Sequence, residues 1–228
     1  IEDTAWGCGG NLNGKYLGTW GDIGCFSFDF AKTITTGEGG MLLFKSKKIY
    51  EKAKAWHDHG HENNPKFPRW EDTRKNSGFN FRMNEMQGAV GLAQLKKLNF
   101  IIKMQRKNHD IIWKKLKNIN GIVLRNYPKG SYVSADSLII YFKKPKLAKK
   151  CRIELLKNGI STKILPEANT WHFAKKWTHI KELKPQLKSK NFAKSEKFIS
   201  TAVSIPLTVY MDKRTPELIY RSILKVFS

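Results

Sequence analysis

Residues 24–40 read GCFSFDFAKTITTGEGG, and this stretch decides the fold of the first part of the chain. Phe26, Phe28 and Phe30 alternate with other residues, so they share one face of a predicted strand and are expected to pack into a core. Lys32 follows where the alternation ends, and a turn of threonines and glycines comes next. A lysine that leaves a rigid element beside hydroxyl groups becomes a nucleophile when burial or nearby charge lowers its pKa. The stretch therefore predicts a strand that delivers a reactive lysine to a turn, with an ordinary surface lysine as the alternative.

The composition is that of an ordinary folded protein. The chain has 228 residues, of which 40% are hydrophobic, enough for one or two domains with a sizeable core. No apolar run approaches the roughly 18 residues that cross a bilayer, and no signal-peptide pattern opens the chain. Cys8, Cys25 and Cys151 are odd in number and lack the spacing of metal ligands, which is typical of a reducing cytoplasm. We therefore expect a cytoplasmic protein with no membrane partner.

The net charge of +23 raises the alternative of a basic nucleic-acid-binding module. Of the 42 basic residues, however, 34 are lysine and only 8 are arginine, the residue preferred for bidentate recognition of phosphates and bases. The lysines are scattered along predicted helix surfaces, a pattern that a lysine-rich proteome also produces. We therefore expect no nucleic-acid partner, although a positive field would attract an acidic substrate.

Hydrophobic periodicity and turn residues predict the order of elements along the chain. Asn84 and Gln87 have the spacing of a capping box at a helix N-terminus. The polar, proline-interrupted stretch 60–77 predicts a long loop, which within a compact domain is usually functional or mobile. In chain order the sequence predicts a buried strand over 40–44, a helix over 46–58, helices over 84–98 and 99–118, strands over 121–125 and 137–143, a helix over 147–158, a strand over 160–164 and a final helix over 215–227.

Separated motifs along the chain resemble the sugar aminotransferases of the DegT/StrS type, which are pyridoxal-phosphate (PLP) enzymes of the aspartate-aminotransferase fold. In that family an acidic residue closes a strand in the pattern EDxA, and a Ser-Phe pair and a lysine followed by Thr-Gly-Glu-Gly-Gly come later. The matching residues are Glu2-Asp3, Ser27-Phe28, Lys32 and 36–40, then His59-Gly60, Asn80 to Met83, Gln94-Leu95 and Ser204 to Leu207. The resemblance covers essentially the whole chain, with the motifs in the family's order.

The resemblance implies an α/β fold in two parts. Residues 1–105 are expected to form the C-terminal part of the large domain of a PLP fold type I enzyme, and residues 106–228 a smaller α+β domain. Family members are close to twice this length, and Ile1 to Asp3 are expected to end a buried strand. The resemblance therefore implies that the chain is a C-terminal fragment without the N-terminal half. Such a fragment is expected to hold PLP poorly and to be inactive alone.

The resemblance also assigns cofactor roles. Lys32 matches the lysine that forms a Schiff base with PLP and shuttles a proton; related sugar dehydratases carry histidine there, so lysine favours transamination. Asp3 matches the partner of the pyridinium nitrogen, and Ser27 matches a donor to the phosphate. Asn80 matches an asparagine that reaches the phosphate across a dimer interface, which implies a homodimer with a shared active site. Trp6 stands where many members have glutamine or histidine, and its indole could donate to the cofactor's ring hydroxyl, stack or fill space.

The long loop and the stretch 165–172 carry the candidate substrate contacts. Their sequences resemble a subgroup that aminates position 8 of a 3-deoxy-octulosonate, an acidic sugar of bacterial lipopolysaccharide, with glutamate as the amino donor. Sugar-nucleotide aminotransferases remain the alternative within the family, and an inactive truncated pseudo-enzyme is a further alternative. The candidate substrate-binding residues are His59, Arg69, Arg74, Arg82, Trp171 and His172, of which the arginines are suited to carboxylates.

Three histidines also suggest a zinc site. His57, His59 and His61 alternate beside Asp58 and Glu62, and such side chains can ligate Zn²⁺. The resemblance places this run at a helix end and in a loop, where alternation does not gather the histidines on one face. We therefore predict no metal site and expect His59 to be structural or close to the substrate.

Overall fold

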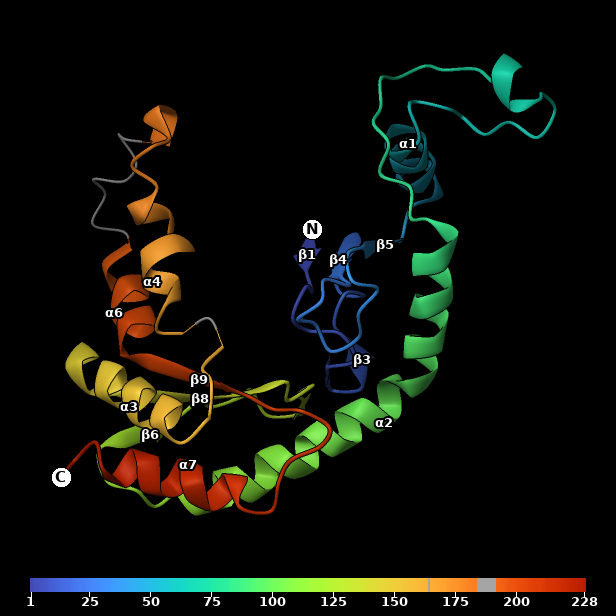
Figure 1. Ribbon diagram of the computed structural model, residues 1–228. Helices are drawn as coiled ribbons and strands as arrows, with labels where there is room; N and C mark the ends of the chain where they lie inside the picture. The colour runs from blue at the N-terminus through green and yellow to red at the C-terminus, as the bar shows by residue number, and fades with distance from the viewer. Residues whose placement is uncertain (164, 184–191) are drawn as a thin grey trace. The chain divides into compact units, whose positions relative to one another are not determined.

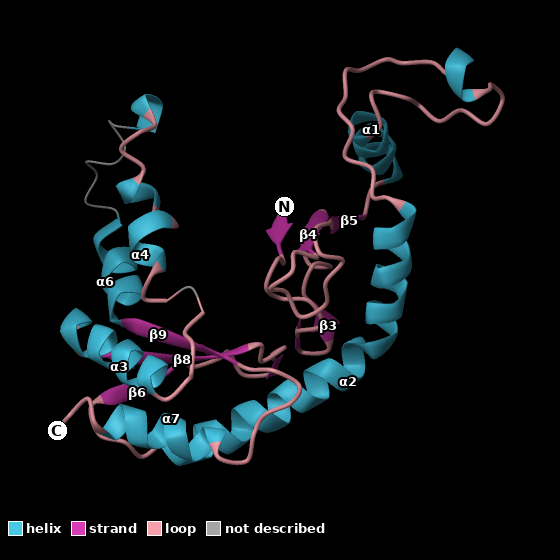
Figure 2. Cartoon of the chain, in the orientation of Figure 1, coloured by secondary structure: helices cyan, strands magenta, loops and turns pink. Residues whose placement is uncertain are grey.

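The computed structural model describes residues 1–163, 165–183 and 192–228 of the chain (Figure 1). These residues form two compact units, one of Ile1–Ile101 with Pro128–Ser134 and the other of Ile102–Tyr127 with Ala135–Ser228. Each unit combines helices with small sheets (Figure 2), which confirms the predicted α/β character. None of the described helices is both long and apolar enough to cross a membrane.

The main sheet of the first unit has three strands. Strand β4 (Ile23–Ser27) is central, pairs in parallel with β1 (Glu2–Asp3) and pairs in antiparallel fashion with β5 (Gly40–Phe44). The predicted strand over 40–44 is confirmed, but its predicted burial is wrong. Met41, Leu42 and Leu43 are 40–50% exposed, because β5 is an edge strand and the described residues of this unit do not cover it.

Two further burial predictions around this sheet are wrong. Ile1 is 90% exposed, and Phe30 is 77% exposed, whereas Phe26 and Phe28 are partly buried. For Phe30 the reason lies at Asp29, whose Oδ1 accepts the Ala31 N–H at 3.0 Å and turns the chain. Strand β4 has already ended at Ser27, so Phe30 no longer follows the alternation of the strand.

A second small sheet is built around a tight hairpin. Strands β2 (Asn11–Leu12) and β3 (Lys15–Tyr16) are joined by Asn13 and Gly14, which both have positive φ, at 51° and 80°. An Asn-Gly pair is the usual choice for such a two-residue turn. Strand β7 (Ser131–Tyr132) pairs with β2 from a distant part of the sequence and completes the sheet.

Two helices of the predicted pattern are present with altered bounds. Helix α1 (Lys47–His57) begins after Ser46, whose Oγ accepts the Ile49 N–H at 3.4 Å. Helix α2 (Glu85–Leu116) begins with the predicted capping box, since Asn84 and Gln87 exchange hydrogen bonds of 2.8 and 3.1 Å. The prediction of two helices over 84–118 is wrong: neither proline nor a terminating glycine interrupts the chain near Leu98, and one helix runs through.

The second unit packs helices around a three-stranded antiparallel sheet. Strand β8 (Ser137–Phe142) lies between β6 (Ile122–Leu124) and β9 (Ala202–Pro206). The remaining elements are α3 (Pro145–Lys157), α4 (Ala168–Trp171), η2 (Ala174–Lys176), η3 (Lys181–Leu183), α6 (Ala193–Thr201) and α7 (Thr215–Leu224). Ile140, Leu155 and Ile219 are fully buried in its core, and each such side chain contributes about 1.5–3 kcal/mol.

The predicted strand over 160–164 is not formed by residues 160–163, and residue 164 lies outside the described part of the chain. The Lys163 N–H donates to Ser204 O at 2.7 Å, and the Ser204 N–H donates to Leu165 O at 3.3 Å. Lys163 and Leu165 therefore form backbone hydrogen bonds with the buried strand β9, although residues 160–163 do not form a strand. Strand β9 and helix α6 were not predicted, although the motif 204–207 lies at the end of β9.

Candidate functional site

Asp3 and Ser27 lie at the same edge and on the same face of the main sheet. Strand β1 is parallel to β4, with Asp3 opposite Cys25, and parallel strands end at the same edge. Ser27 lies two residues beyond Cys25, so its side chain is on the same face. Asp3 is exposed, and its Oδ1 accepts the Ala5 N–H at 3.0 Å. Ligands of open α/β sheets bind at the carboxyl ends of parallel strands, which is where both groups are placed.

Glu2 has a structural role that the sequence did not reveal. Its carboxylate accepts the backbone N–H groups of Gly18 at 2.6 Å, Trp20 at 2.9 Å and Gly21 at 3.1 Å. Burial opposes ionisation of Glu2, but these three hydrogen bonds together outweigh it and lower the pKa of its carboxyl. Of the two adjacent acidic residues, Glu2 therefore fixes the loop that precedes β4, and Asp3 is the one available to a ligand.

Lys32 follows the edge that Asp3 and Ser27 share. The Lys32 N–H donates to Asp29 O at 3.1 Å in the turn after β4, and the side chain is partly buried. Its Nζ lies 3.4 Å from the centroid of the Trp6 ring, in a cation–π contact. Trp6, for which the sequence left three roles open, thus lies against the lysine.

The threonine- and glycine-rich turn after Lys32 is held by its own hydroxyl groups. Thr35 Oγ1 donates to Phe28 O at 3.1 Å, and Thr36 Oγ1 donates to Glu38 O at 2.7 Å. Gly39 has φ of 151°, and an added Cβ there would lie 2.5 Å from Thr36 Oγ1. The turn thereby closes against the end of β4 and fixes the segment that carries Lys32.

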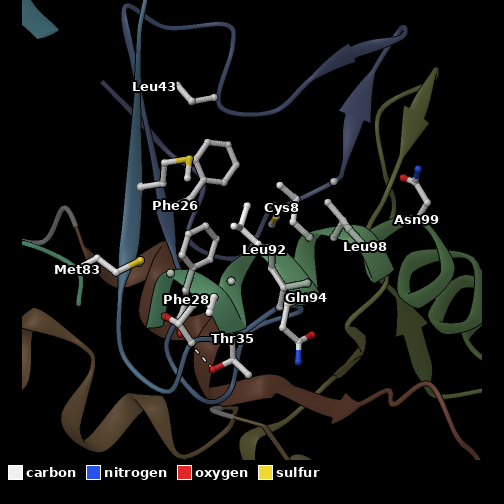
Figure 3. A pocket seen from close by; sticks show the side chains of 18 of the residues that line it. Cys8, Phe26, Phe28, Thr35, Leu43, Met83, Leu92, Gln94, Leu98 and Asn99 are labelled. Atoms are coloured by element: carbon white, nitrogen blue, oxygen red, sulfur yellow. Dashed lines mark hydrogen bonds between the residues drawn. The ribbon is translucent and has the colours of Figure 1, made fainter. Parts of the chain in front are cut away.

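A cavity of about 760 Å³ in the first unit is mainly apolar (Figure 3). Phe26 and Phe28 line it together with side chains such as Met83 and Leu92. None of the predicted site residues is among its lining residues. A phosphate group would lose hydration there without gaining charged partners, so the chemistry of this cavity does not suit a phosphorylated cofactor.

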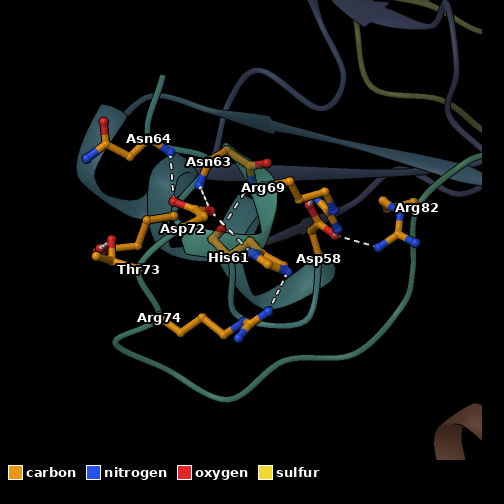
Figure 4. A network of polar contacts seen from close by, with 10 residues as sticks. Asp58, His61, Asn63, Asn64, Arg69, Asp72, Thr73, Arg74 and Arg82 are labelled. Carbon is orange, nitrogen blue, oxygen red and sulfur yellow. Dashed lines mark hydrogen bonds and ion pairs between the residues drawn. The ribbon is translucent and has the colours of Figure 1, made fainter. Parts of the chain in front are cut away.

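A second group of predicted site residues lies in the loop between α1 and α2 (Figure 4). Asp58 is only 4% exposed and binds two arginines. Arg69, at the start of the short helix η1 (Arg69–Glu71), donates from both terminal nitrogens at 2.6 and 2.9 Å, and Arg82 donates from Nη1 at 2.5 Å. Hydrogen bonds from Arg69, and then from Arg82, outweigh burial and hold the pKa of Asp58 well below its usual range.

Arg74 belongs to a separate set of contacts in this loop. Its Nη2 donates to His61 Nε2 at 2.9 Å, and His61 Nδ1 lies 3.3 Å from Asp72 Oδ2. Asp72 also accepts the backbone N–H groups of Asn64 at 3.0 Å and Asn63 at 2.7 Å. The Asn64 hydrogen bond, supported by that of Asn63, lowers the pKa of Asp72 although burial opposes this.

The other predicted substrate and cofactor contacts are distributed over both units. Asn80 is exposed, forms an isolated bridge with Asp58 and accepts the Arg82 N–H through Oδ1 at 3.4 Å. His59 is exposed and has a positive φ of 55° in the chain reversal after α1. Trp171 ends α4 in the second unit, followed by the exposed His172, whose N–H donates to Ala168 O at 2.9 Å. Their roles stay predictions.

The candidate zinc ligands make other contacts. His57 Nδ1 lies 2.5 Å from Lys54 O, His61 contacts Asp72 and Arg74, and Asp58 is bound by arginines. Within the described residues no group of three or more histidine, cysteine or acidic side chains could hold a metal ion.

The ionisation of Asp58 should make the free energy of unfolding depend on pH. Because its pKa is lower in the folded state, it stabilises the fold above its unfolded pKa of about 4, and this stabilisation is lost as pH falls below that value. We expect Asp58→Asn to lower the free energy of unfolding at pH 7 by about 1–3 kcal/mol. The difference from the parent protein should shrink at pH 3, as measured by urea unfolding at both values.

Asp22→Asn is the matched control, because Asp22 is exposed and its side chain makes no hydrogen bond within the described residues. This variant should unfold like the parent protein at both pH values. An Asp58→Asn penalty of equal size at pH 7 and pH 3 would contradict the assigned ionisation.

Comparison with known proteins identifies similar chains. A model of the DegT/DnrJ/EryC1/StrS aminotransferase family matches residues 1–223. GDP-perosamine synthase of Escherichia coli O157:H7 is 41% identical over 123 residues, which are 54% of this chain and 32% of that protein. The UDP-4-amino-4,6-dideoxy-N-acetyl-beta-L-altrosamine transaminase of Helicobacter pylori is 29% identical over 231 residues, which cover 100% of this chain and 58% of that protein.

A solved structure shows the same fold. GDP-4-keto-6-deoxymannose-3-dehydratase, crystallised with PLP and glutamate trapped together, superimposes with a TM-score of 0.77 at 22% identity, over 94% of this chain and 58% of that chain. This chain thus spans less than two thirds of the length of the proteins it matches. The likeness confirms the predicted fold class, and the family model covers nearly every residue. The chain belongs to the DegT/DnrJ/EryC1/StrS aminotransferase family.

Proposed function

We propose that the protein is a PLP-dependent aminotransferase that transfers an amino group from glutamate to a carbonyl sugar. The observation that carries this proposal is the placement of Asp3 and Ser27 on one face at one edge of the sheet, with Lys32 in the turn that follows. A primary amine can react with the aldehyde of PLP. A carboxylate can pair with its pyridine nitrogen, and a hydroxyl can donate to its phosphate. The donor set therefore fits PLP.

When bound, PLP supplies an electron sink that stabilises the charge developing at the substrate carbon. Lys32 Nζ would bind the cofactor's aldehyde carbon and, once released, would move the proton at the substrate carbon. Asp3 would keep the pyridine nitrogen protonated, and Ser27 Oγ would donate to the phosphate. Trp6 would hold the Lys32 ammonium in place through its ring face.

Asn80 supports a proposal about assembly. Its side chain is exposed at the start of the segment that leads into α2. As the resemblance implies, Asn80 would reach the phosphate in a second copy of the protein. We therefore propose a homodimer with shared active sites.

The names of the relatives favour a nucleotide-linked sugar as the amino acceptor. The Escherichia coli relative is a GDP-perosamine synthase, and the Helicobacter pylori relative acts on a UDP-linked sugar. These names do not support the 3-deoxy-octulosonate acceptor that the loop sequence suggested. We propose the sugar-nucleotide alternative in its place.

Lys32 also favours amino transfer over dehydration. A solved structure with the same fold is a dehydratase. The family resemblance implies that such dehydratases carry histidine where this chain has Lys32. An imidazole can move a proton but cannot form the same covalent bond with the cofactor aldehyde. The structure with PLP and glutamate trapped together also supports glutamate as a donor that this fold accepts.

An acceptor screen tests the proposal. The natural full-length protein, loaded with PLP and glutamate, is given GDP- and UDP-linked 4-keto sugars and 8-oxo-3-deoxy-octulosonate in separate reactions. Release of 2-oxoglutarate with a nucleotide-linked sugar is expected. Release of 2-oxoglutarate with the octulosonate alone would instead support the octulosonate as the amino acceptor. PLP binding with no turnover of any acceptor would favour an inactive pseudo-enzyme, and retention on DNA at physiological salt without PLP binding would favour a basic binding module.

A further inference from the structure

Arg74 differs in its contacts from the two other arginines of the loop between α1 and α2 (Figure 4). Arg69 and Arg82 both donate to the Asp58 carboxylate, so each has a buried anionic partner, and that carboxylate offsets one of their two positive charges. Arg74 has no carboxylate within ion-pair distance among the described residues, and its side-chain contact is with His61 Nε2. A guanidinium has five N–H donors, and Arg74 is exposed, so most of its donors face solvent.

The partner of Arg74 is itself fixed in place. His61 and Asp72 are only 5% and 9% exposed, and Asp72 is anchored by the backbone N–H groups of Asn63 and Asn64. An ionised Asp72 beside Nδ1 favours the proton on Nδ1, which leaves the lone pair of Nε2 free to accept from Arg74. The contacts with Asp72 and Arg74 on its two nitrogens thus hold the ring in one orientation.

The backbone supports the same geometry. His61 and Arg74 form an isolated antiparallel bridge, and the Glu62 N–H donates to Thr73 O at 3.1 Å. Lys75 Nζ lies 2.9 Å from Glu62 Oε1 on the adjacent residues. Two segments of a long loop are thereby joined next to Arg74, so its side chain starts from a defined position.

We propose that Arg74 binds an oxyanion of the substrate and that His61 and Asp72 position it for this purpose. The planar guanidinium fork matches a carboxylate or a phosphate equally well. The oxyanion is the carboxylate of the amino donor or the diphosphate of the nucleotide-linked sugar. This identification rests on the proposed function, and it narrows the three candidate arginines to one. Arg69 and Arg82 instead tie η1 and the segment before α2 to Asp58.

Direct anion binding tests the proposal without turnover. The natural full-length protein is titrated separately with inorganic phosphate and with glutarate, a dicarboxylate, and the arginine Nε–Hε NMR signals are followed. The Arg74 signal is identified by its absence in Arg74→Lys. We expect this signal to shift with one of the two probes, and we expect Arg74→Gln to weaken that binding by about 10-fold to 100-fold. Phosphate identifies the diphosphate as the source, and glutarate identifies the donor carboxylate.

Variants of His61 separate positioning from mere folding. His61→Gln keeps an acceptor for Arg74 and should retain anion binding within about 3-fold, whereas His61→Leu should weaken it by about 3-fold to 10-fold. Arg214→Gln is the matched control, since Arg214 is exposed and pairs with Asp212 in the second unit; it should bind the anion like the parent protein. Equal melting temperatures of Arg74→Gln and Arg214→Gln establish that both are folded.

Three results would overturn the proposal. They are an Arg74 signal that neither probe shifts, an Arg74→Gln variant that binds both probes as the parent protein does, and an Arg69→Gln variant that loses as much binding as Arg74→Gln. PLP binding is recorded in the same samples. If the parent protein fails to bind PLP but Arg74 still binds the anion, the proposed function fails and the anion site stands.

Discussion

Lys32→Ala is expected to abolish the visible absorption band of lysine-bound PLP and, with it, the proposed amino transfer to a sugar. The reason is chemical: alanine has no amine to bind the cofactor aldehyde or to move the proton at the substrate carbon. Loss of a positioned acid–base group alone costs about 10²-fold to 10⁴-fold in rate. The absorption spectrum of the natural full-length protein, before and after addition of PLP, and the release of 2-oxoglutarate measure both effects.

Lys47→Ala is the control for Lys32→Ala. Lys47 is exposed at the start of α1, after the N-cap residue Ser46, so its replacement should leave both the spectrum and the rate unchanged. A Lys32→Ala protein that kept the visible band would show that another amine binds the cofactor. The role proposed for Trp6 would then fail as well, since Trp6 acts through its contact with Lys32.

Gly24→Ala should unfold the first unit or bring it close to unfolding. A Cβ on Gly24 would lie 2.0 Å from Gly18 O and 2.7 Å from Gly18 C, and both are backbone atoms. They cannot swing aside, because the Glu2 carboxylate holds the Gly18 N–H at 2.6 Å. Overpacking costs about 1–3 kcal/mol and more when the backbone must move, so we expect at least about 3 kcal/mol in urea unfolding.

Gly88→Ala is the matched control for this change. Gly88 lies within helix α2, and an added Cβ meets no atom within 4 Å. Alanine is favoured over glycine in a helix by roughly 1 kcal/mol, so this variant should be more stable than the parent protein. If both substitutions shifted the unfolding midpoint in the same direction, the close approach of β4 to the Gly18 loop would be wrong.

The parts of the fold that follow from local chemistry were predictable from the sequence. The capping box of Asn84 and Gln87 involves only neighbouring residues, and it appears as expected. The strand over 40–44 follows from a short apolar run between glycine-rich and polar segments. The early end of β4 also had a local signal, because Asp29 can accept a backbone N–H two residues on, but the alternation of phenylalanines hid it.

Contacts between distant residues explain most of what the sequence did not reveal. Glu2 and Asp3 have similar side chains, and only the position of the loop at Gly18 shows that Glu2 is structural. The same holds in the loop between α1 and α2, where Asp58 binds Arg69 and Arg82 and His61 binds Arg74. These pairs depend on how a long loop closes. A loop has no regular repeat like that of a helix or strand, so such pairs cannot be predicted from the spacing of its residues.

Chemical mapping of the cofactor attachment tests whether Lys32 is the residue that binds PLP. The natural full-length protein is loaded with PLP, reduced with borohydride to fix any covalent bond to lysine, digested and analysed by mass spectrometry. We expect one modified peptide, with the cofactor mass on Lys32 in the stretch that runs from β4 to β5. Modification of a different lysine, or a protein that binds PLP without any reducible bond, would contradict it.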